Sequence, residues 1–307
     1  MLTYNLWHGF WRTAEKEIVL LPAEPRADRE RRQAAQLAAL EGLRPDVLMA
    51  QEVHPLPWRA RELARGLGHR PIHQLVSCGV RFLHVGVPWR IRSGLAMTAR
   101  TELELERVAA PLLSGQFGFC SDWLGLQLEE ARRALLGRVR LEDGRRLLLV
   151  TAHLHSSTEG GETRGERRLR EVEGLLAAIE SARREDPTIA GVILGGDFNA
   201  LADSGPIQVL RRAGFVDTAR RLGAEFATYD PWSNQLAAQM TRAGGGDPAH
   251  SAPRRIDFLF VSDELAETVR AVHIFGAGPA GERAAAAASD HFGVLLELDL
   301  DSGVGTE

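Results

Sequence analysis

Apolar and polar positions follow two different periods along the chain, and these periods predict strands and helices. Short apolar runs, alternating or continuous, are typical of strands. The predicted strands are MLTYNL, DVLMAQEV, SGLAMTAR, ELELERV, AGVILGGDF, RRIDFLFVS, TVRAVHIF and FGVLLELDL, with SGLAMTAR and ELELERV as neighbours. LLGRVRLEDGRRLLLVTAHL predicts a hairpin, because Glu142, Asp143 and Gly144 form a turn of the Asp-Gly type between two apolar runs.

Apolar residues three and four positions apart predict helices between these strands. This spacing covers residues 28–43 and 163–184, and a third helix follows Ser204, a candidate cap, with Pro206 in its first turn. Two glycine- and alanine-rich segments are predicted as loops: 243–253 and 276–289. Because strands occur both in hairpins and between helices, we predict an α/β fold of two packed mixed β-sheets flanked by helices.

Length and composition are those of one globular domain, which we place at residues 1–307. With 44% hydrophobic and 25% charged residues, disorder is not indicated. A net charge of −4 removes the simplest argument for a nucleic-acid binder, although a local basic patch is compatible with it. No basic and apolar leader opens the sequence, no run reaches the ~20 apolar residues of a membrane span, and no heptad indicates oligomerisation. We therefore expect a cytoplasmic protein with no transmembrane segment.

Cys78 and Cys120 lie in no CxxC or CxxH spacing, so the sequence implies neither a zinc site nor a disulfide framework. We expect two reduced thiols.

Polar side chains recur where predicted strands end, at six places along the chain. They are Asn5, Gln51, Glu52, His153, His155, Asp197, Asn199, Asp257, Asp290 and His291. If these strand ends share one edge, the side chains converge in one cleft. Carboxylate and amide oxygens suit Mg²⁺ or Mn²⁺, whereas zinc usually recruits more nitrogen or sulfur. Such a cleft fits metal-assisted hydrolysis of a phosphate ester.

Six motifs in order carry a family resemblance: TYNLWHG, LMAQEV, TAHLHS, GGDFNA, RRIDFLFVS and SDHFGV. From residue 3 to about residue 298 the chain resembles the endonuclease/exonuclease/phosphatase superfamily, also called DNase I-like. That superfamily includes DNase I-like nucleases, exonuclease III-like repair enzymes, deadenylases, inositol phosphatases and neutral sphingomyelinases. The resemblance implies a four-layered α/β sandwich.

The resemblance also implies roles for the residues at the strand ends. Glu52 is the expected direct ligand of a Mg²⁺ or Mn²⁺ ion, with Asn5 and Asp290 near the ion. The expected catalytic residues are His153, Asp197, Asn199, Asp257 and His291. Among them, Asp197 would orient or deprotonate the attacking water and Asp257 would fix the imidazole of His291. A plainer reading of Asp197 and Asn199 is that they cap the following helix.

Substrate contacts are predicted from shorter matches. Arg132 resembles an arginine that precedes the central hairpin in relatives, with Arg133 as the rival. The segment 228–237 resembles a stretch of bacterial sphingomyelinases and adds Tyr229 and Asn234. His155 is a further candidate, with a surface position as the alternative. Several other side chains are candidates for the pocket or for ordinary core and surface roles: Phe117, Phe119, Trp123, Trp232, Arg164 and Arg167.

The predicted function is hydrolysis of a phosphodiester, with a lipid or small-molecule leaving group in the manner of sphingomyelinase-like relatives. A nuclease acting on DNA or RNA, a phosphomonoesterase and an inactive binding scaffold are the alternatives. The tryptophan-containing signature of inositol phosphatases is absent, and Pro253 and Arg254 replace the Gly-Trp typical of exonuclease III-like enzymes.

Overall fold

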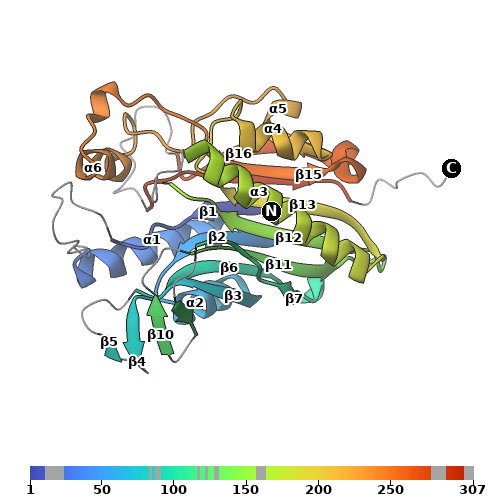
Figure 1. Cartoon of the computed structure of the whole chain (residues 1–307), viewed down its shortest axis with the longest axis horizontal. Helices are drawn as coiled ribbons and strands as arrows, with labels where there is room; N and C mark the ends of the chain where they lie inside the picture. The colour runs from blue at the N-terminus through green and yellow to red at the C-terminus, as the bar shows by residue number, and fades with distance from the viewer. Residues whose placement is uncertain are drawn as a thin grey trace.

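Two large β-sheets packed face to face form the centre of the molecule, and helices cover their outer faces (Figure 1). This computed structural model describes residues 1–10, 24–82, 85–86, 91–115, 118–121, 124–127, 131–156, 164–277 and 288–300. The predicted four-layered α/β sandwich is confirmed.

The first large sheet contains both termini of the described chain. Its order is β16-β17-β1-β2-β6-β3, and β1 and β2 are parallel while the other neighbours are antiparallel. The strands are β1 (Leu2–Asn5), β2 (Val47–Val53), β3 (His69–Ser77), β6 (Ser93–Arg100), β16 (Val269–Phe275) and β17 (Gly293–Leu298).

The second large sheet has the order β14-β15-β13-β12-β11-β7, with β8 also paired to β11. Here β12 and β13 are the parallel pair. The strands are β7 (Glu106–Ala109), β8 (Leu112–Ser114), β11 (Arg132–Arg140), β12 (Arg146–His153), β13 (Ile189–Asp197), β14 (Phe215–Asp217) and β15 (Asp257–Ser262). The predicted hairpin is β11–β12.

A small third sheet projects from the end of the molecule near β3 (Figure 1). Its strands, in spatial order, are β5 (Val85–Gly86), β4 (Val80–Phe82), β10 (Leu124–Gln127) and β9 (Gly118–Cys120). This sheet brings Cys120 to Cys78, and the two form a disulfide, so the prediction of reduced thiols is wrong. A separation of 42 residues gave no sign of the pairing, because only the turn of the chain into the small sheet brings the sulfurs together.

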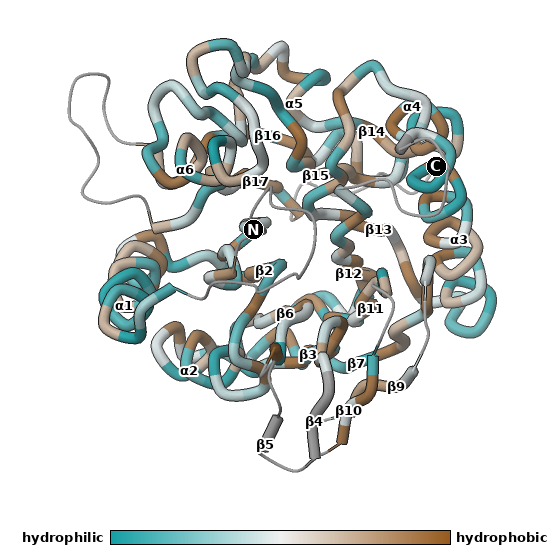
Figure 2. Tube along the Cα trace, turned by 60° about the vertical axis from the view of Figure 1, so that its left-hand side comes forward, coloured by the Kyte–Doolittle hydropathy of each residue, from teal (hydrophilic) through white to brown (hydrophobic). Residues whose placement is uncertain are grey.

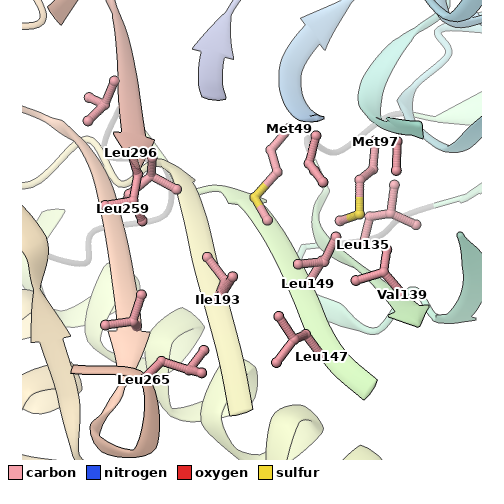
Figure 3. Packing of buried hydrophobic residues seen from close by; sticks show 14 of the residues in the cluster. Met49, Met97, Leu135, Val139, Leu147, Leu149, Ile193, Leu259, Leu265 and Leu296 are labelled. Atoms are coloured by element: carbon pink, nitrogen blue, oxygen red, sulfur yellow. The ribbon is translucent and has the colours of Figure 1, made fainter. Parts of the chain in front are cut away.

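Strand residues alternate between two cores because successive side chains point to opposite faces. On β2, Met49 faces the second sheet, whereas Leu48 packs outward under the helices. On β12, Leu149 faces the first sheet, whereas Val150 packs outward. Figure 3 shows Met49, Leu149 and Ile193 meeting in the core between the two sheets.

Four helices cover the outer faces of the two large sheets. In Figure 2, α1 (Arg26–Leu43) and α2 (Trp58–Leu67) lie on one side, and α3 (Arg164–Glu185) and α4 (Gly205–Arg212) lie on the other. The remaining helices are α5 (Thr218–Arg221), α6 (Gln235–Ala243) and the 3-10 turns η1 (Thr101–Leu103), η2 (Pro248–His250) and η3 (Asp263–Thr268). Among the described helices, none has the length and apolar composition of a membrane span.

Three local predictions need correction. ELELERV is not one strand beside β6: its start is η1, and β7 pairs with β11 in the other sheet. Ser204 precedes α4, but its hydroxyl donates to the Leu201 carbonyl and does not cap the helix. The predicted loop 243–253 contains η2, and residues 278–287 of the other predicted loop lie outside the described residues.

Candidate active site

Strand register brings the predicted residues together at one end of the sandwich. His153 on β12 is the register partner of Asp197 on β13, and Asp197 is the partner of Asp257 on β15. These three side chains therefore sit on adjacent strands of one sheet. Asn5 is at the end of β1 in the facing sheet, opposite Gln51 of β2. The strand ends of both sheets thus share one edge, as the sequence predicts.

Asp197 lies at the centre of this group. Asn5 Nδ2 donates to Asp197 Oδ2 at 3.1 Å, which links the two sheets, and the Asn199 backbone N–H donates to Asp197 Oδ1 at 2.8 Å. His153 Nε2 lies 3.4 Å from Asp197 Oδ2, and His291 Nε2 lies 3.8 Å from the same atom. Both imidazoles therefore face one carboxylate oxygen, His153 from the end of β12 and His291 from the segment before β17.

The glycine before Asp197 is needed for this approach. Gly196 has a φ of +155°, and a Cβ at this position would lie 2.0 Å from the Ala152 carbonyl oxygen on β12. A residue with a side chain would thus push β12 and β13 apart at the point where their ends carry His153 and Asp197.

Asp257 and His291 form a buried pair. His291 Nδ1 and Asp257 Oδ2 are 2.8 Å apart, and the Asp257 backbone N–H donates to Thr228 Oγ1 at 3.0 Å. The ring of Tyr229 packs edge-on against the His291 ring. This pair fixes the imidazole with its Nε2 toward Asp197.

Glu52 occupies the other side of the group, on the first sheet. The His8 backbone N–H donates to Glu52 Oε2 at 3.0 Å, and Asn5 Nδ2 lies 3.3 Å from Glu52 Oε1. His153 Nε2 is 3.9 Å from Glu52 Oε1. Asn5 therefore touches both Glu52 and Asp197, and its own Oδ1 accepts the Trp7 N–H at 3.0 Å.

The pKa values of the acids differ because their surroundings differ. Burial, followed by the negative charge of Asp257, raises the pKa of Asp197 to about 7. Burial likewise raises the pKa of Asp290 to about 6, and the charge of Glu52 adds to this rise. Burial alone would raise the pKa of Glu52, but the positive charges of His8 and then His153 outweigh burial and lower that pKa to about 2.

The imidazole of His291 is held in its charged form. Burial alone would lower the pKa of His291, but the negative charges of Asp257, Asp197 and Asp290 raise that pKa well above its usual value. The protonated imidazole is therefore the favoured form at this position, between the Asp257 carboxylate and the centre of the site.

The donor set fits a divalent metal ion. Carboxylate oxygens of Asp197 and Asp257 lie within 4.8 Å of each other and of a His291 ring nitrogen, and all three residues are buried. The donors to an ion are the carboxylates, with Glu52 on the other side of Asn5, because a protonated imidazole has no free lone pair. Asp257 Oδ1 is buried with no hydrogen-bond partner among the described residues. Burial and then the charge of neighbouring acids raise the pKa of Asp197 and Asp290, and a bound cation would offset both effects. Oxygen-rich side chains of this kind suit a hard cation.

A cavity of about 250 Å³ opens beside these residues, between the two sheets. Its described lining is His8, Glu52, Val76, Ser77, Ser93, Gly94, Leu95, Arg132, Arg133, His153 and Ser156. The sequence analysis missed His8 and the three serines. His8 directly follows the TYNLW run, so its nearness to Asn5 was the available signal; the serines carry no motif.

Of the four predicted substrate-binding residues, Arg132 alone is among the described residues that line the cavity. Arg132 lines the cavity, as does its rival Arg133. His155 is buried behind Arg132: Arg132 Nε donates to His155 Nδ1 at 3.3 Å, and the His155 backbone N–H donates to Glu171 Oε2 at 2.9 Å. His155 is thus neither on the surface nor on the described cavity wall, so its position supports Arg132 and not a direct substrate contact.

Tyr229 and Asn234 also lie behind the site. The Tyr229 hydroxyl donates to the Ala237 carbonyl at 3.0 Å, while its ring packs on His291. Asn234 caps α6, and its Nδ2 donates to the Ser289 carbonyl at 2.9 Å. Both residues position the chain around His291, and the structure does not bring them to the described cavity wall.

Of the other candidates, those that the structure describes do not line the cavity. Phe119 and Trp232 are exposed on the surface, and Arg167 is buried with its Nε 3.8 Å from Glu171 Oε1. Phe117, Trp123 and the side chain of Arg164 lie outside the described residues. Asn199 Nδ2 donates to the Leu154 carbonyl at 3.0 Å, so only its backbone holds Asp197.

Comparison with known proteins agrees with this geometry. The model of the Endonuclease/Exonuclease/phosphatase family matches residues 2–291. The chain belongs to this family. Its members are phosphoesterases and nucleases that generally depend on a divalent metal ion, and the chain is accordingly a metal-dependent hydrolase of ester bonds, a phosphoesterase.

Solved structures share the fold over nearly the whole chain. D. rerio TDP2 complexed with single-strand DNA product is 17% identical, with a TM-score of 0.61, and the match covers 97% of this chain and 98% of that one. Mannosyl-6-phosphatase Bt3783 of Bacteroides thetaiotaomicron is 17% identical, with a TM-score of 0.59 and the same two coverages. The human Nocturnin catalytic domain with bound sulfate is 16% identical, with a TM-score of 0.57, covering 88% of this chain and 86% of that one. Comparison with curated proteins gave no match.

Proposed function

We propose that this protein is a Mg²⁺- or Mn²⁺-dependent phosphodiesterase that hydrolyses its substrate by in-line attack of water. The observation that carries the proposal is the meeting of Asn5 and Glu52 from one sheet with His153, Asp197 and Asp257 from the other, with His291 completing the group. Acid and imidazole groups so placed supply a base and a cation side by side, where both can act on one reacting phosphate.

Each side chain has a task that follows from its position. Asp197, with a pKa raised to about 7, is suited to accept a proton from water near neutral pH. His291 is kept cationic by Asp257 and stabilises negative charge that develops on the phosphoryl oxygens. His153, facing the same oxygen of Asp197, binds a phosphoryl oxygen from the neighbouring strand.

Glu52, with Asn5 and Asp290 nearby, is the proposed metal-binding group. Glu52 is suited to this task because its low pKa keeps it ionised over the whole working range of pH. When bound, Mg²⁺ or Mn²⁺ would neutralise the charge of the phosphoryl oxygens. Arg132, held from behind by His155, lines the cavity where it would meet the substrate phosphate.

The substrate we favour is a diester with a small-molecule or lipid leaving group, in the manner of sphingomyelinase-like relatives. A nuclease is the second candidate, since the similar D. rerio TDP2 was solved with single-strand DNA product. The likeness to mannosyl-6-phosphatase Bt3783 supports a phosphomonoesterase as a third. An inactive scaffold is the least favoured, because the acids and imidazoles are all retained in contact distance.

A substrate panel tests the proposal. Purified protein with Mg²⁺, Mn²⁺ or EDTA is assayed on bis-p-nitrophenyl phosphate, p-nitrophenyl phosphate, sphingomyelin, and labelled DNA and RNA. We expect metal-dependent release of p-nitrophenol from the diester, faster than from the monoester. If the protein prefers nucleic acid or the monoester, it is a nuclease or a phosphomonoesterase instead. If it turns over no substrate, only the inactive scaffold remains.

We further propose that residues 1–307 act as one catalytic domain. A cytoplasmic location stays a prediction, and the Cys78–Cys120 disulfide argues against it, since such bonds persist mainly in oxidising compartments. Alkylation of the two cysteines in fresh extract, followed by mass measurement, tests this: free thiols favour the cytoplasm, and a retained disulfide contradicts it.

A further inference from the structure

One wall of the cavity is polar but takes no part in the proposed chemistry. Ser77 ends β3 and Ser93 begins β6, and the two residues are register partners on neighbouring strands. Both line the cavity. Neither hydroxyl has a hydrogen-bond partner among the described residues, although Ser93 is buried. Both hydroxyls are thus available to a group bound in the cavity, as donors or as acceptors.

The opposite wall carries positive charge. Arg133 follows Arg132 on β11 and also lines the cavity, where its Nη1 donates to the Ala110 carbonyl at 3.0 Å. Among the described lining residues, Glu52 is the only carboxylate, and the proposed metal would offset its charge. Guanidinium groups together with hydroxyls are the usual partners of phosphate oxygens.

The size and lining of the cavity restrict what can bind. A volume of about 250 Å³ is below the range of roughly 300–1,000 Å³ typical of pockets for drug-sized ligands. No Phe, Tyr or Trp occurs among its described lining residues, so the imidazoles and guanidiniums are the flat groups that these residues offer a nucleobase. The cavity therefore suits a short, hydroxylated group.

We infer that Ser77, Ser93 and Arg133 form a subsite for a second phosphate group of the substrate. The inference rests on the proposed function, and it names the substrate class: a sugar or polyol that carries a second phosphate beside the one attacked. Arg132 would then serve the reacting phosphate, and Arg133 the phosphate that is retained.

Paired inhibitors test the subsite. The test measures how strongly fructose 1,6-bisphosphate and fructose 6-phosphate each inhibit hydrolysis of bis-p-nitrophenyl phosphate in excess Mg²⁺. We expect the bisphosphate to inhibit at about tenfold lower concentration, as one charge-assisted hydrogen bond would give. Arg133→Gln and the double variant Ser77→Ala/Ser93→Ala should each remove most of this ratio. Arg140→Gln, the same substitution at the exposed far end of β11, should keep it.

The outcomes separate the subsite from the proposed function. If no substrate is hydrolysed, the proposed function fails, and calorimetric binding of the two sugar phosphates still measures the ratio. Equal affinity for the two in the wild-type protein, or an unchanged ratio in Arg133→Gln, overturns the subsite. Thymidine 3′,5′-bisphosphate and thymidine 5′-monophosphate form a second pair: a ratio seen with this pair alone keeps the second phosphate but overturns the free sugar or polyol in favour of a nucleotide.

Discussion

Glu52 shows how the site uses an unfavourable backbone conformation. Its φ is +53°, in the left-handed region that a glutamate rarely adopts, and it lies where the β2–β6 register shifts between Ala50 and Val53. The shift turns the Glu52 carboxylate toward the His8 N–H and Asn5. A left-handed backbone conformation costs an L-residue roughly 1–2 kcal/mol, so contacts with neighbouring residues must stabilise this conformation.

Substitutions at Glu52 separate backbone cost from carboxylate contacts. We expect Glu52→Gly to be more stable than Glu52→Ala by about 1 kcal/mol, because only glycine adopts φ +53° without steric cost. Both variants lose the same carboxylate and should lose activity alike. Urea denaturation in EDTA measures the difference. Equal stability, or a more stable alanine variant, would show that the conformation carries no cost.

At the scale of elements, α3 reaches the cavity through a chain of buried polar contacts. Glu171 on α3 accepts the His155 backbone N–H at 2.9 Å and a hydrogen bond from the Ser114 hydroxyl of β8. His155 in turn accepts from Arg132. Burial alone would raise the pKa of Glu171, but hydrogen bonds from His155 and Ser114 lower it. Hydrogen bonds thereby connect α3, β8 and the segment after β12 to Arg132, which lines the cavity.

We predict that Glu171→Gln weakens substrate binding more than turnover. The amide cannot match the charged acceptor, so Arg132 loses its fixed orientation, and KM should rise about tenfold with a smaller change in kcat. Steady-state kinetics on bis-p-nitrophenyl phosphate measures both constants. Glu173→Gln, on the exposed side of the same helix, is the matched control. A fall in kcat with KM unchanged would contradict the positioning role.

Asp217, the last residue of β14, forms ion pairs with α4 and with the segment that precedes β15. Its Oδ1 and Oδ2 each accept from Arg255 at 2.8 Å, and Oδ2 also accepts from Arg211 at 2.8 Å. The carboxylate also caps α5 by accepting from the Arg220 N–H. Burial alone would raise the pKa of Asp217, but Arg255 and then Arg211 lower it below its usual value.

This pKa shift fixes the sign of a pH dependence. Since the folded pKa lies below the unfolded one, the carboxylate contributes stability above the unfolded pKa of about 3.9, and that stability is lost as pH falls through the folded pKa. Asp217→Asn should cost about 3 kcal/mol at pH 7, and the gap to wild type should persist to about pH 4 and narrow below it. Urea denaturation of both proteins across this pH range measures the difference between their free energies of unfolding. A gap that widens on acidification would contradict the assignment.

For the whole molecule, the site exists because the two sheets end at the same edge. The sequence predicted this edge correctly because Asp197 and Asp257 interrupt apolar runs whose strands could be recognised. The inner core of Figure 3 then sets the distance across which Asn5 reaches Asp197. The mixture of hairpins and helix-separated strands was thus sufficient to predict the fold class, and the polar strand ends indicated which side chains meet.

The parts that the sequence did not predict depend on packing between distant segments. β3 has a mixed polar pattern without a clear period and was not recognised. α2 was also missed, although Ala60, Leu63 and Ala64 follow helical spacing, because only ten residues carry the pattern. Ser77 and Ser93 become neighbours only when β3 pairs with β6, so the sequence did not identify them as cavity residues. His155 and Tyr229 matched motifs of substrate contacts, but burial decides their roles, and burial cannot be read from a motif.

The most direct test of the whole account compares three proteins on bis-p-nitrophenyl phosphate: wild type, Asp197→Asn, and Asp203→Asn, whose side chain is 87% exposed. Asp197→Asn should lower kcat by about 10²–10⁴-fold while unfolding in EDTA at no lower urea concentration than wild type, because burial disfavours the charge it removes. Asp203→Asn should keep the full wild-type activity. EDTA should abolish the activity of both the wild type and Asp203→Asn. Wild-type turnover by Asp197→Asn, or turnover indifferent to EDTA, would contradict a metal-dependent phosphoesterase centred on Asp197.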